Sequence, residues 1–154
     1  SASSVVITIS TNGAAATSLG TFPLTAPLTL FGLSGTDSVK IVGTSGSDVI
    51  QVSSSGLLIN GATLILDSTE SLLLVGSAGN DTYQFDADNA LGLISLDEGG
   101  GGIDTLDFSG FGGNTVLDLR QGSFSSTGVE TYNVSVAYGA VIVLLLLLWG
   151  RDFM

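Results

Sequence analysis

A short pattern of glycines, one aspartate and two apolar residues recurs four times in this 154-residue chain. In each copy, glycines stand five and two residues before the aspartate, and apolar residues stand two and four residues after it. Glycine permits crowded turn conformations, and alternating apolar residues are typical of a strand with one buried face. Each copy therefore predicts a tight turn, an oxygen ligand and a short strand. The copies span Gly32–Ile41, Gly43–Val52, Gly76–Phe85 and Gly99–Phe108.

The composition agrees with a fold made of strands and turns. The chain has 22 glycines and 2 prolines, and 44% of its residues are hydrophobic. Abundant glycine without proline, beside many Val, Ile, Leu and Thr residues, favours short strands joined by tight turns. No segment shows a helical stripe longer than one turn. We expect an all-β fold, a right-handed parallel β-solenoid of the β-helix or β-roll kind with glycine-rich turns.

The spacing of the copies predicts a column of aspartates. The last three copies begin 33 and 23 residues apart, and one coil of a solenoid takes roughly 20–35 residues. Their turns can therefore recur at one corner of successive coils, about 4.8 Å apart. Asp48, Asp81 and Asp104 would then form a column of carboxylates, whose mutual repulsion bound cations would relieve.

Two other interpretations of the acidic residues need no such column. An aspartate in a turn can cap its own backbone as an Asx-turn, without a metal. The stretch from Asp86 and Asp88 to Asp97 and Glu98 faintly resembles an EF-hand loop, but it lacks the fifth-position ligand and the central glycine. For that stretch we expect a solvated loop.

The four copies resemble the RTX (haemolysin-type calcium-binding) repeats of secreted bacterial proteins, especially the scattered copies in large surface and adhesin-like proteins. The resemblance covers Gly32–Leu119 and is most specific at Gly79–Tyr83 and Gly101–Phe108. It implies Ca²⁺ as the cofactor and a secreted, extracellular or cell-surface location in a bacterium. The implied ligands are the carboxylates of Asp37, Asp48, Asp81 and Asp104 and backbone groups of the turns marked by Gly43, Gly46, Gly76, Gly79, Gly99 and Gly101.

Catalysis and nucleic-acid binding have little support in the sequence. Cysteine and histidine are absent, which removes thiol nucleophiles, histidine bases and the usual zinc sites. The formal net charge is −11 with only three Lys and Arg residues, whereas phosphate backbones need clustered cations. We expect neither an enzyme nor a nucleic-acid partner. A carbohydrate-binding or glycoside-cleaving β-solenoid remains an alternative.

The repeats divide the chain into three expected parts. Residues 1–31 are predicted to form an N-terminal strand and cap region, 32–136 the RTX-like solenoid, and 137–154 an apolar tail. The run 140–149 is shorter than the roughly 20 apolar residues that a membrane span needs. We expect it to pack as a strand or short helix against the solenoid end or a neighbouring subunit, with a membrane anchor as the alternative.

These expectations combine into one functional hypothesis. The chain begins with Ser1, and we expect a processed chain or a part of a longer one. Solenoids have open ends that must be capped or stacked. We therefore expect an extracellular, non-enzymatic, calcium-binding structural or adhesive module that self-assembles end to end, as a filament or surface-layer subunit. A membrane-anchored adhesin module is the alternative.

Overall fold

The computed structural model confirms the all-β prediction for the part of the chain that it describes. The described residues are 4–11, 14–23, 25–32, 34–54, 56–85, 92–110, 115–116, 118, 120, 123–127, 134–136 and 142–145. These residues contain strands, turns and bends and no helix. The strands are β1 (Ser4–Thr11), β2 (Thr17–Pro23), β3 (Leu28–Phe31), β4 (Asp37–Val42), β5 (Val49–Ser53), β6 (Gly56–Ile59), β7 (Ala62–Asp67), β8 (Ser71–Val75), β9 (Thr82–Phe85), β10 (Leu93–Asp97), β11 (Asp104–Asp107), β12 (Thr115–Val116), β13 (Phe124–Thr127), β14 (Val134–Val136) and β15 (Ile142–Leu145).

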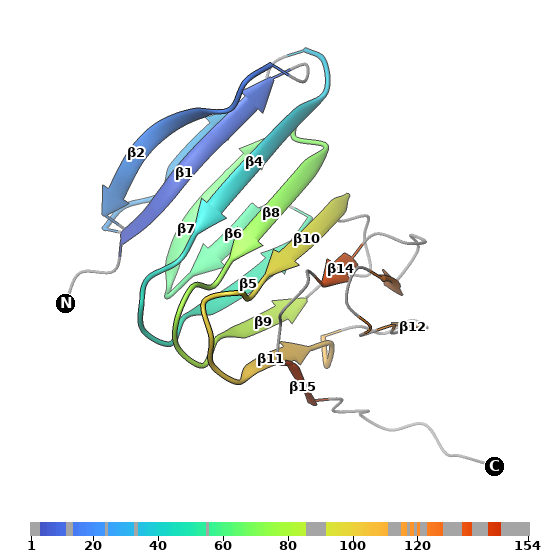
Figure 1. The fold of residues 1–154 in the computed structure, drawn as a ribbon. Coiled ribbons are helices and arrows are strands. Elements are labelled where there is room, and N and C mark those ends of the chain that lie inside the picture. The colour runs from blue at the N-terminus through green and yellow to red at the C-terminus, as the bar shows by residue number, and fades with distance from the viewer. Residues whose placement is uncertain are drawn as a thin grey trace.

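The strands form two facing sheets. The first sheet has the order β12-β13-β14-β10-β8-β4-β1-β2, and the second has the order β15-β11-β9-β5-β6-β7-β3. Strands β4, β8, β10 and β14 lie parallel in the first sheet, and β5, β9, β11 and β15 lie parallel in the second. The chain therefore alternates between the sheets, and Figure 1 shows three of its connections side by side at one edge.

The sheets are mixed and do not form the closed parallel solenoid that the sequence suggested. Antiparallel pairs interrupt the parallel stacking: β1 with β2 and β4, β6 with β5 and β7, and β13 with β12 and β14. The physical reason is clearest at β6 and β7. Asn60 and Gly61 both have positive φ, 49° and 87°, as the two-residue turn of a hairpin requires. This turn folds the chain back into the same sheet.

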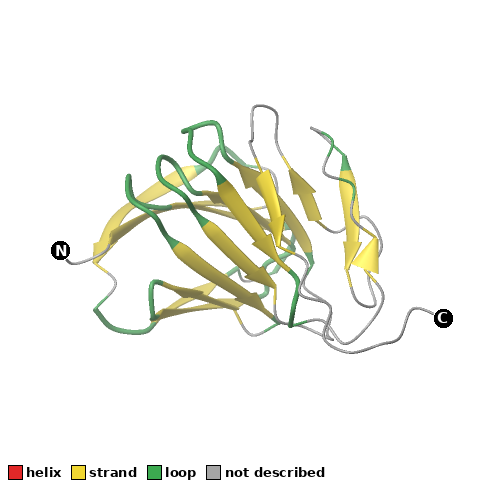
Figure 2. Ribbon diagram, turned by 90° about the horizontal axis from the view of Figure 1, so that it is seen from below, coloured by secondary structure: helices red, strands yellow, loops and turns green. Residues whose placement is uncertain are grey.

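Alternating side chains fill the space between the sheets. Ile41, Leu74 and Leu96 stand in register on the first sheet, and each has at most 1% of its surface exposed. On the second sheet, the rings of Phe85 and Phe108 stack with centroids 4.7 Å apart. Each fully buried apolar side chain stabilises the fold by roughly 1.5–3 kcal/mol before ordering entropy is counted. Figure 2 shows the two layers of strands, and the buried side chains of both sheets form one hydrophobic cluster.

The segments outside the repeats extend these sheets at their edges. Strands β1 and β2 form a hairpin at the end of the first sheet, and β3 is the last strand of the second sheet. Ile142–Leu145, within the apolar run, pairs with β11 as β15. The rest of the run 140–149 and residues 86–88 lie outside the described residues, and the three-part division of the chain stays a prediction. The described part of the chain contains no helix long and apolar enough to cross a membrane.

The stacked turns predict a position-dependent cost for adding a side chain. Gly46 and Gly102 hold the same place in the motif, two residues before the aspartate. A Cβ on Gly102, where φ is +133°, would overlap the carbonyl oxygen of Gly79, whereas a Cβ on Gly46 would meet nothing closer than 3.8 Å. Left-handed backbone costs a residue with a Cβ roughly 1–2 kcal/mol, and the overlap adds to that.

We therefore expect Gly102→Ala to lower the free energy of unfolding by about 2 kcal/mol or more. The matched variant Gly46→Ala is expected to change it by less than about 0.5 kcal/mol. Urea unfolding in the presence of a chelator measures both values without a contribution from bound metal. Equal losses in the two variants would contradict the stacking of the turns.

Candidate metal centre

Three aspartates form a column along the edge where the first sheet passes into the second. Asp48, Asp81 and Asp104 each have 1% of their surface exposed. The backbone N–H of Asp48 donates to Oδ1 of Asp81 at 2.8 Å, and the backbone N–H of Asp81 donates to Oδ1 of Asp104 at 3.0 Å. The 33- and 23-residue spacings thus bring together the carboxylates that the sequence predicted to be neighbours.

Asp48, the first residue of the column, accepts hydrogen bonds from other residues on both of its carboxylate oxygens. Asp48 accepts hydrogen bonds from the backbone N–H of Thr44 at 2.8 Å and from its hydroxyl at 3.0 Å. It also accepts one from the side-chain amide of Asn60 at 2.6 Å. This is the metal-free turn that was the alternative interpretation of the aspartates, extended by a partner from the hairpin turn. Both carboxylate oxygens of Asp48 thus have donors in the protein, and its predicted role as a metal ligand stays a prediction.

The other two carboxylates join a third acid in a compact cluster. Asp81, Glu98 and Asp104 are all buried, and each offers a carboxylate oxygen within 4.8 Å of the others. One oxygen of each, Oδ2 of the aspartates and Oε2 of Glu98, is buried without a hydrogen-bond partner. Burying a carboxylate without a partner costs several kcal/mol. The arrangement supplies negative charge and free oxygen atoms at one point, which are the properties of a cation site.

Glu98, which the sequence interpretation placed in a solvated loop, is instead buried in the cluster. The register pairs Leu96 with Leu74 and Asp97 with Val75, so Glu98 takes the place that Gly76 holds in the preceding turn. The turn from Asp97 to Asp104 has one more residue between the strand and the aspartate than the turn from Val75 to Asp81. That extra residue moves the motif glycines along by one position and turns the Glu98 side chain inward. Comparing the number of residues from Leu96 to Asp104 with the number from Leu74 to Asp81 could have revealed this extra residue.

Tyr83 and Gly76 shape the cluster from the neighbouring coil. The hydroxyl of Tyr83 donates a hydrogen bond to Oε1 of Glu98, which leaves Oε2 for another partner. A Cβ on Gly76 would come 2.6 Å from Oε2 of Glu98 and 2.7 Å from the Tyr83 hydroxyl. Only a glycine fits there without moving these groups. The predicted site glycine Gly76 therefore forms one wall of the cluster.

The remaining predicted glycines lie in the same stacked turns. Gly43 donates its N–H to the carbonyl of Val75 at 2.7 Å, and Gly79 donates to the carbonyl of Gly101 at 3.2 Å. The N–H of Gly46 bonds to the Thr44 hydroxyl, and that of Gly99 bonds to the Asp97 carboxylate. The bonds of Gly43 and Gly79 join successive turns, and those of Gly46 and Gly99 close their own turns. Ligation of a metal by the turn carbonyls stays a prediction.

Asp37 lies apart from the column. Its turn leads from the second sheet to the first, from β3 to β4, whereas the turns before Asp48, Asp81 and Asp104 lead from the first sheet to the second. The 11-residue spacing between the first two copies amounts to half a coil, so Asp37 is at the opposite edge. Its side chain is fully buried, and neither of its carboxylate oxygens has a hydrogen-bond partner.

The cluster raises the pKa values of two of its acids. Burial, followed by repulsion from Asp104 and Asp81, raises the pKa of Glu98 from its ordinary 4.5 to about 8. Burial, with smaller contributions from Asp48 and Asp104, raises the pKa of Asp81 from 3.8 to about 6. Without a cation, the folded chain therefore binds protons that the unfolded chain has already released.

The comparisons with known proteins place this site in a family. Residues 76–153, half of the chain, match the family described as Peptidase M10 serralysin C terminal. The chain belongs to this family. The matched residues include Asp81 and Asp104 of the aspartate column, Glu98 and the apolar run 140–149. No solved structure matches the chain.

The similar proteins are bacterial peptidases of this serralysin family. Serralysin C of Dickeya chrysanthemi is 44% identical over 55 residues, which cover 36% of this chain and 12% of that protein. Metallopeptidase AprA of Pseudomonas marginalis is 48% identical over 54 residues, 35% of this chain and 11% of that protein. Serralysin of Proteus mirabilis is 50% identical over 42 residues, 27% and 9% respectively. The match thus spans about a tenth of each relative.

Membership of the serralysin C-terminal family tests the expected resemblance, cofactor and location of the chain. It carries RTX-type repeats that bind Ca²⁺, which confirms the RTX resemblance and the predicted cofactor. It also confirms the predicted secreted, extracellular location. The adhesin-like part of the resemblance has no support from these comparisons.

The raised pKa values predict that the metal-free protein becomes less stable as the pH rises. Folded Asp81 and Glu98 hold protons up to about pH 6 and 8, so the stability present below pH 4 is lost as the pH rises through those values. We expect the melting temperature in chelator to fall between pH 5 and pH 8.5. Glu98→Gln should remove the part of this fall above pH 6. A melting temperature that is flat or rises over this interval would contradict the assignment.

Proposed function

We propose that the chain is a non-enzymatic calcium-binding module of a larger secreted protein, with Asp81, Glu98 and Asp104 as its carboxylate ligands. The observation that carries this proposal is the buried cluster in which each carboxylate keeps one oxygen without a partner. A bound cation would satisfy all three oxygens at once. The glycine-rich turns of the RTX motif supply the frame, Asp81 and Asp104 supply two charges, and Glu98 adds a third.

The chemistry of the cluster favours calcium among the common metals. All its side-chain ligands are oxygen atoms, and the chain contains neither histidine nor cysteine. Hard cations such as Ca²⁺ take six to eight oxygen ligands in flexible geometry, whereas zinc and copper prefer nitrogen or sulfur. Backbone carbonyls of the glycine-rich turns and water would complete the coordination. Membership of the serralysin C-terminal family supports the same choice.

The position of the ligands makes calcium a link between neighbouring coils. Asp81 belongs to the turn between β8 and β9, whereas Glu98 belongs to the turn between β10 and β11 and Asp104 is the first residue of β11. A cation bound by all three residues would hold two turns together and remove the repulsion between them. Because the unfolded chain cannot assemble this set, binding energy becomes folding energy. We propose that bound calcium stabilises the folded module, which is less stable without it.

A non-enzymatic role fits the residues that this chain contains. Among the described residues, the buried acids lie in the turns or at the strand ends next to them, and the chain lacks histidine and cysteine as catalytic or zinc-binding groups. The relatives carry the names of peptidases, but the match covers only about a tenth of each. We propose that a longer parent chain is a secreted metallopeptidase and that any proteolysis belongs to its other parts.

Removing one ligand tests the calcium site directly. At 100 times its dissociation constant, calcium stabilises the folded state by about 2.7 kcal/mol, which raises the melting temperature by roughly 5–10 °C for a chain of this size. Asp104→Asn should abolish most of this rise. The control is Asp107→Asn on the same strand, because Asp107 is only partly buried and bonds to Ser109 and Gln84. Differential scanning calorimetry with calcium and with chelator measures both. An unchanged calcium response in Asp104→Asn would contradict the site.

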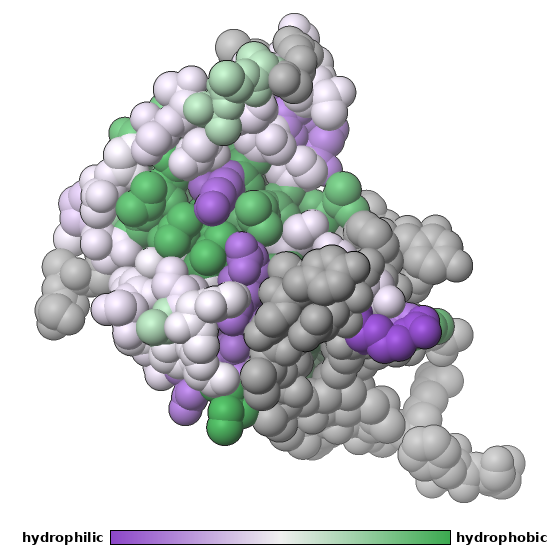
Figure 3. Space-filling view, in the orientation of Figure 1, coloured by the Kyte–Doolittle hydropathy of each residue, from purple (hydrophilic) through white to green (hydrophobic). Residues whose placement is uncertain are grey.

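Self-assembly through the sheets is a second proposal, supported by features of the surface. Strand β3 is the last strand of the second sheet and exposes 64% of Phe31. Figure 3 shows apolar side chains gathered on the outer face of the first sheet, where Leu73 and Leu93 line a groove beside Lys40. Unpaired edges and apolar faces promote association with another copy.

Assembly through β3 has a simple test. We expect Phe31→Lys to lower the fraction of oligomer in analytical ultracentrifugation, because it removes the exposed apolar side chain of the edge strand as well as adding a charge there. Thr29→Lys, on the same strand, is the control for added charge and should have a smaller effect because Thr29 is not an apolar contact. Monodisperse monomer of the unmodified protein at all concentrations would rule out this proposal.

A further inference from the structure

Two departures from the repeat meet inside the molecule. The first is at the inward-facing position two residues after each motif aspartate, which is occupied in the four copies by Val39, Ile50, Tyr83 and Leu106. Tyr83 is the one member of this set with a polar group. The second departure is Glu98, which the extra residue in its turn directs inward. The hydroxyl of Tyr83 donates a hydrogen bond to Oε1 of Glu98, so the two exceptions are partners.

The core holds the ring of Tyr83 in one place. Tyr83 is 0% exposed and stands in register with Ile50 on β5 and with Leu106 on β11. Both neighbours are buried as well. Because protein cores are close-packed, a ring between two such neighbours has little freedom to turn. The hydroxyl is therefore held at a fixed point beside the cluster of acids.

Packing alone gives no reason for a hydroxyl at this position. Ile50 and Leu106 show that an apolar side chain fills the same place in the neighbouring coils. A phenol in an apolar core costs free energy unless its O–H finds a partner. Glu98 is that partner, so the role of the hydroxyl lies in what it does to this carboxylate.

The hydrogen bond divides the two oxygens of Glu98 between two tasks. Oε1 accepts the bond from Tyr83, whereas Oε2 is buried without a hydrogen-bond partner. A Cβ on Gly76 would come 2.6 Å from Oε2, so the glycine leaves this oxygen its room. Glutamate is a long side chain, and fixing it costs rotamer entropy. Tyr83 fixes it in the folded chain, before any cation arrives.

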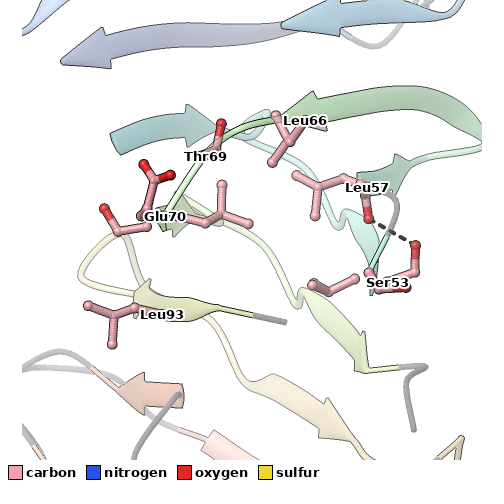
Figure 4. A pocket seen from close by; sticks show the side chains of 11 residues that line it. Ser53, Leu57, Leu66, Thr69, Glu70 and Leu93 are labelled. Carbon is pink, nitrogen blue, oxygen red and sulfur yellow. Dashed lines mark hydrogen bonds between the residues drawn. The ribbon is translucent and has the colours of Figure 1, made fainter. Parts of the chain in front are cut away.

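Glu70 at the opposite edge shows what such an acid does without a phenol. It accepts a hydrogen bond from the backbone N–H of Asp37 at 2.7 Å, yet its side chain is exposed. Figure 4 shows Glu70 and Thr69 at one end of a pocket that is also lined by Leu57, Leu66 and Leu93. No tyrosine is among the described residues that line this pocket. Burial beside a fixed hydroxyl thus distinguishes Glu98 from Glu70.

We propose that Tyr83 is the positioning residue of the calcium cluster, which holds Glu98 with Oε2 directed at the cation and does not itself contact the metal. The inference rests on the proposed function, because it takes Asp81, Glu98 and Asp104 as the ligands. Partners that orient a metal ligand commonly contribute about 10–100-fold to metal affinity. Since the ring is part of the core, Tyr83 also joins calcium binding to the packing of β9 between β5 and β11.

Removing the hydroxyl while keeping the ring tests this role. Isothermal titration calorimetry of the full chain with CaCl₂ measures the affinity of the calcium equivalent that Asp104→Asn removes. We expect Tyr83→Phe to lower this affinity roughly tenfold. The control is Leu66→Ala, a partly buried residue that lines the pocket at the opposite edge (Figure 4). It should lower the melting temperature in chelator and leave the calcium affinity unchanged.

A double-variant cycle separates positioning from a general effect on the fold. If Tyr83 acts through Glu98, its hydroxyl has nothing to orient once the carboxylate is gone. We therefore expect Tyr83→Phe combined with Glu98→Gln to bind calcium within about twofold of Glu98→Gln alone. A merely structural role would lower the affinity by the same factor in both backgrounds, and that result would overturn the proposal.

The outcomes separate this proposal from the proposed function. If Asp104→Asn and Glu98→Gln weaken calcium binding while Tyr83→Phe does not, the cluster stands and the positioning role falls. If Asp104→Asn and Glu98→Gln change nothing, the cluster is wrong and the positioning role falls with it. Tyr83→Leu, which introduces the residue type of the next copy, gives a second test where Tyr83→Phe fails to fold. It should weaken binding at least as much, and unchanged binding would overturn the role.

Discussion

The structure depends on hydrogen bonds between the backbone of one coil and a carboxylate of the next. In the column, the N–H groups of Asp48 and Asp81 donate to the carboxylates one coil further on. Each bond fixes the register of two turns, but each also buries a negative charge beside another one. The same contact therefore orders the coils and repels them. Protons can lower the repulsion, as the raised pKa values of Asp81 and Glu98 indicate, and a bound cation can remove it.

This conflict gives the module a dependence on its surroundings that an apolar core alone would lack. The apolar side chains between the sheets are buried against one another, whereas Asp81, Glu98 and Asp104 each keep a buried oxygen atom without a hydrogen-bond partner. Extracellular calcium modules commonly bind with dissociation constants of about 10⁻⁴–10⁻³ M. Calcium bound at the cluster with such an affinity would offset the buried negative charge of Asp81, Glu98 and Asp104.

The repeat made much of this architecture predictable, because its glycines, aspartates and alternating apolar residues each have a direct structural meaning. The spacings of 33 and 23 residues predicted the column of Asp48, Asp81 and Asp104. Two features of the site depend on differences in spacing, one of a single residue and one of half a coil, that the repeated motif does not reveal. One extra residue in the third turn brings Glu98 inward, and the 11-residue spacing sends Asp37 to the opposite edge. The closed solenoid failed because Asn60 and Gly61 turn the chain back within one sheet.

The central claim is that the unpartnered oxygens of Asp81, Glu98 and Asp104 surround a cation. The most direct measurement is anomalous diffraction from crystals of the full chain grown with terbium, a cation that replaces calcium at oxygen sites. The account predicts a strong anomalous peak within coordination distance of all three carboxylates. An absent peak, with the three acids bonded only to one another and to water, would contradict it.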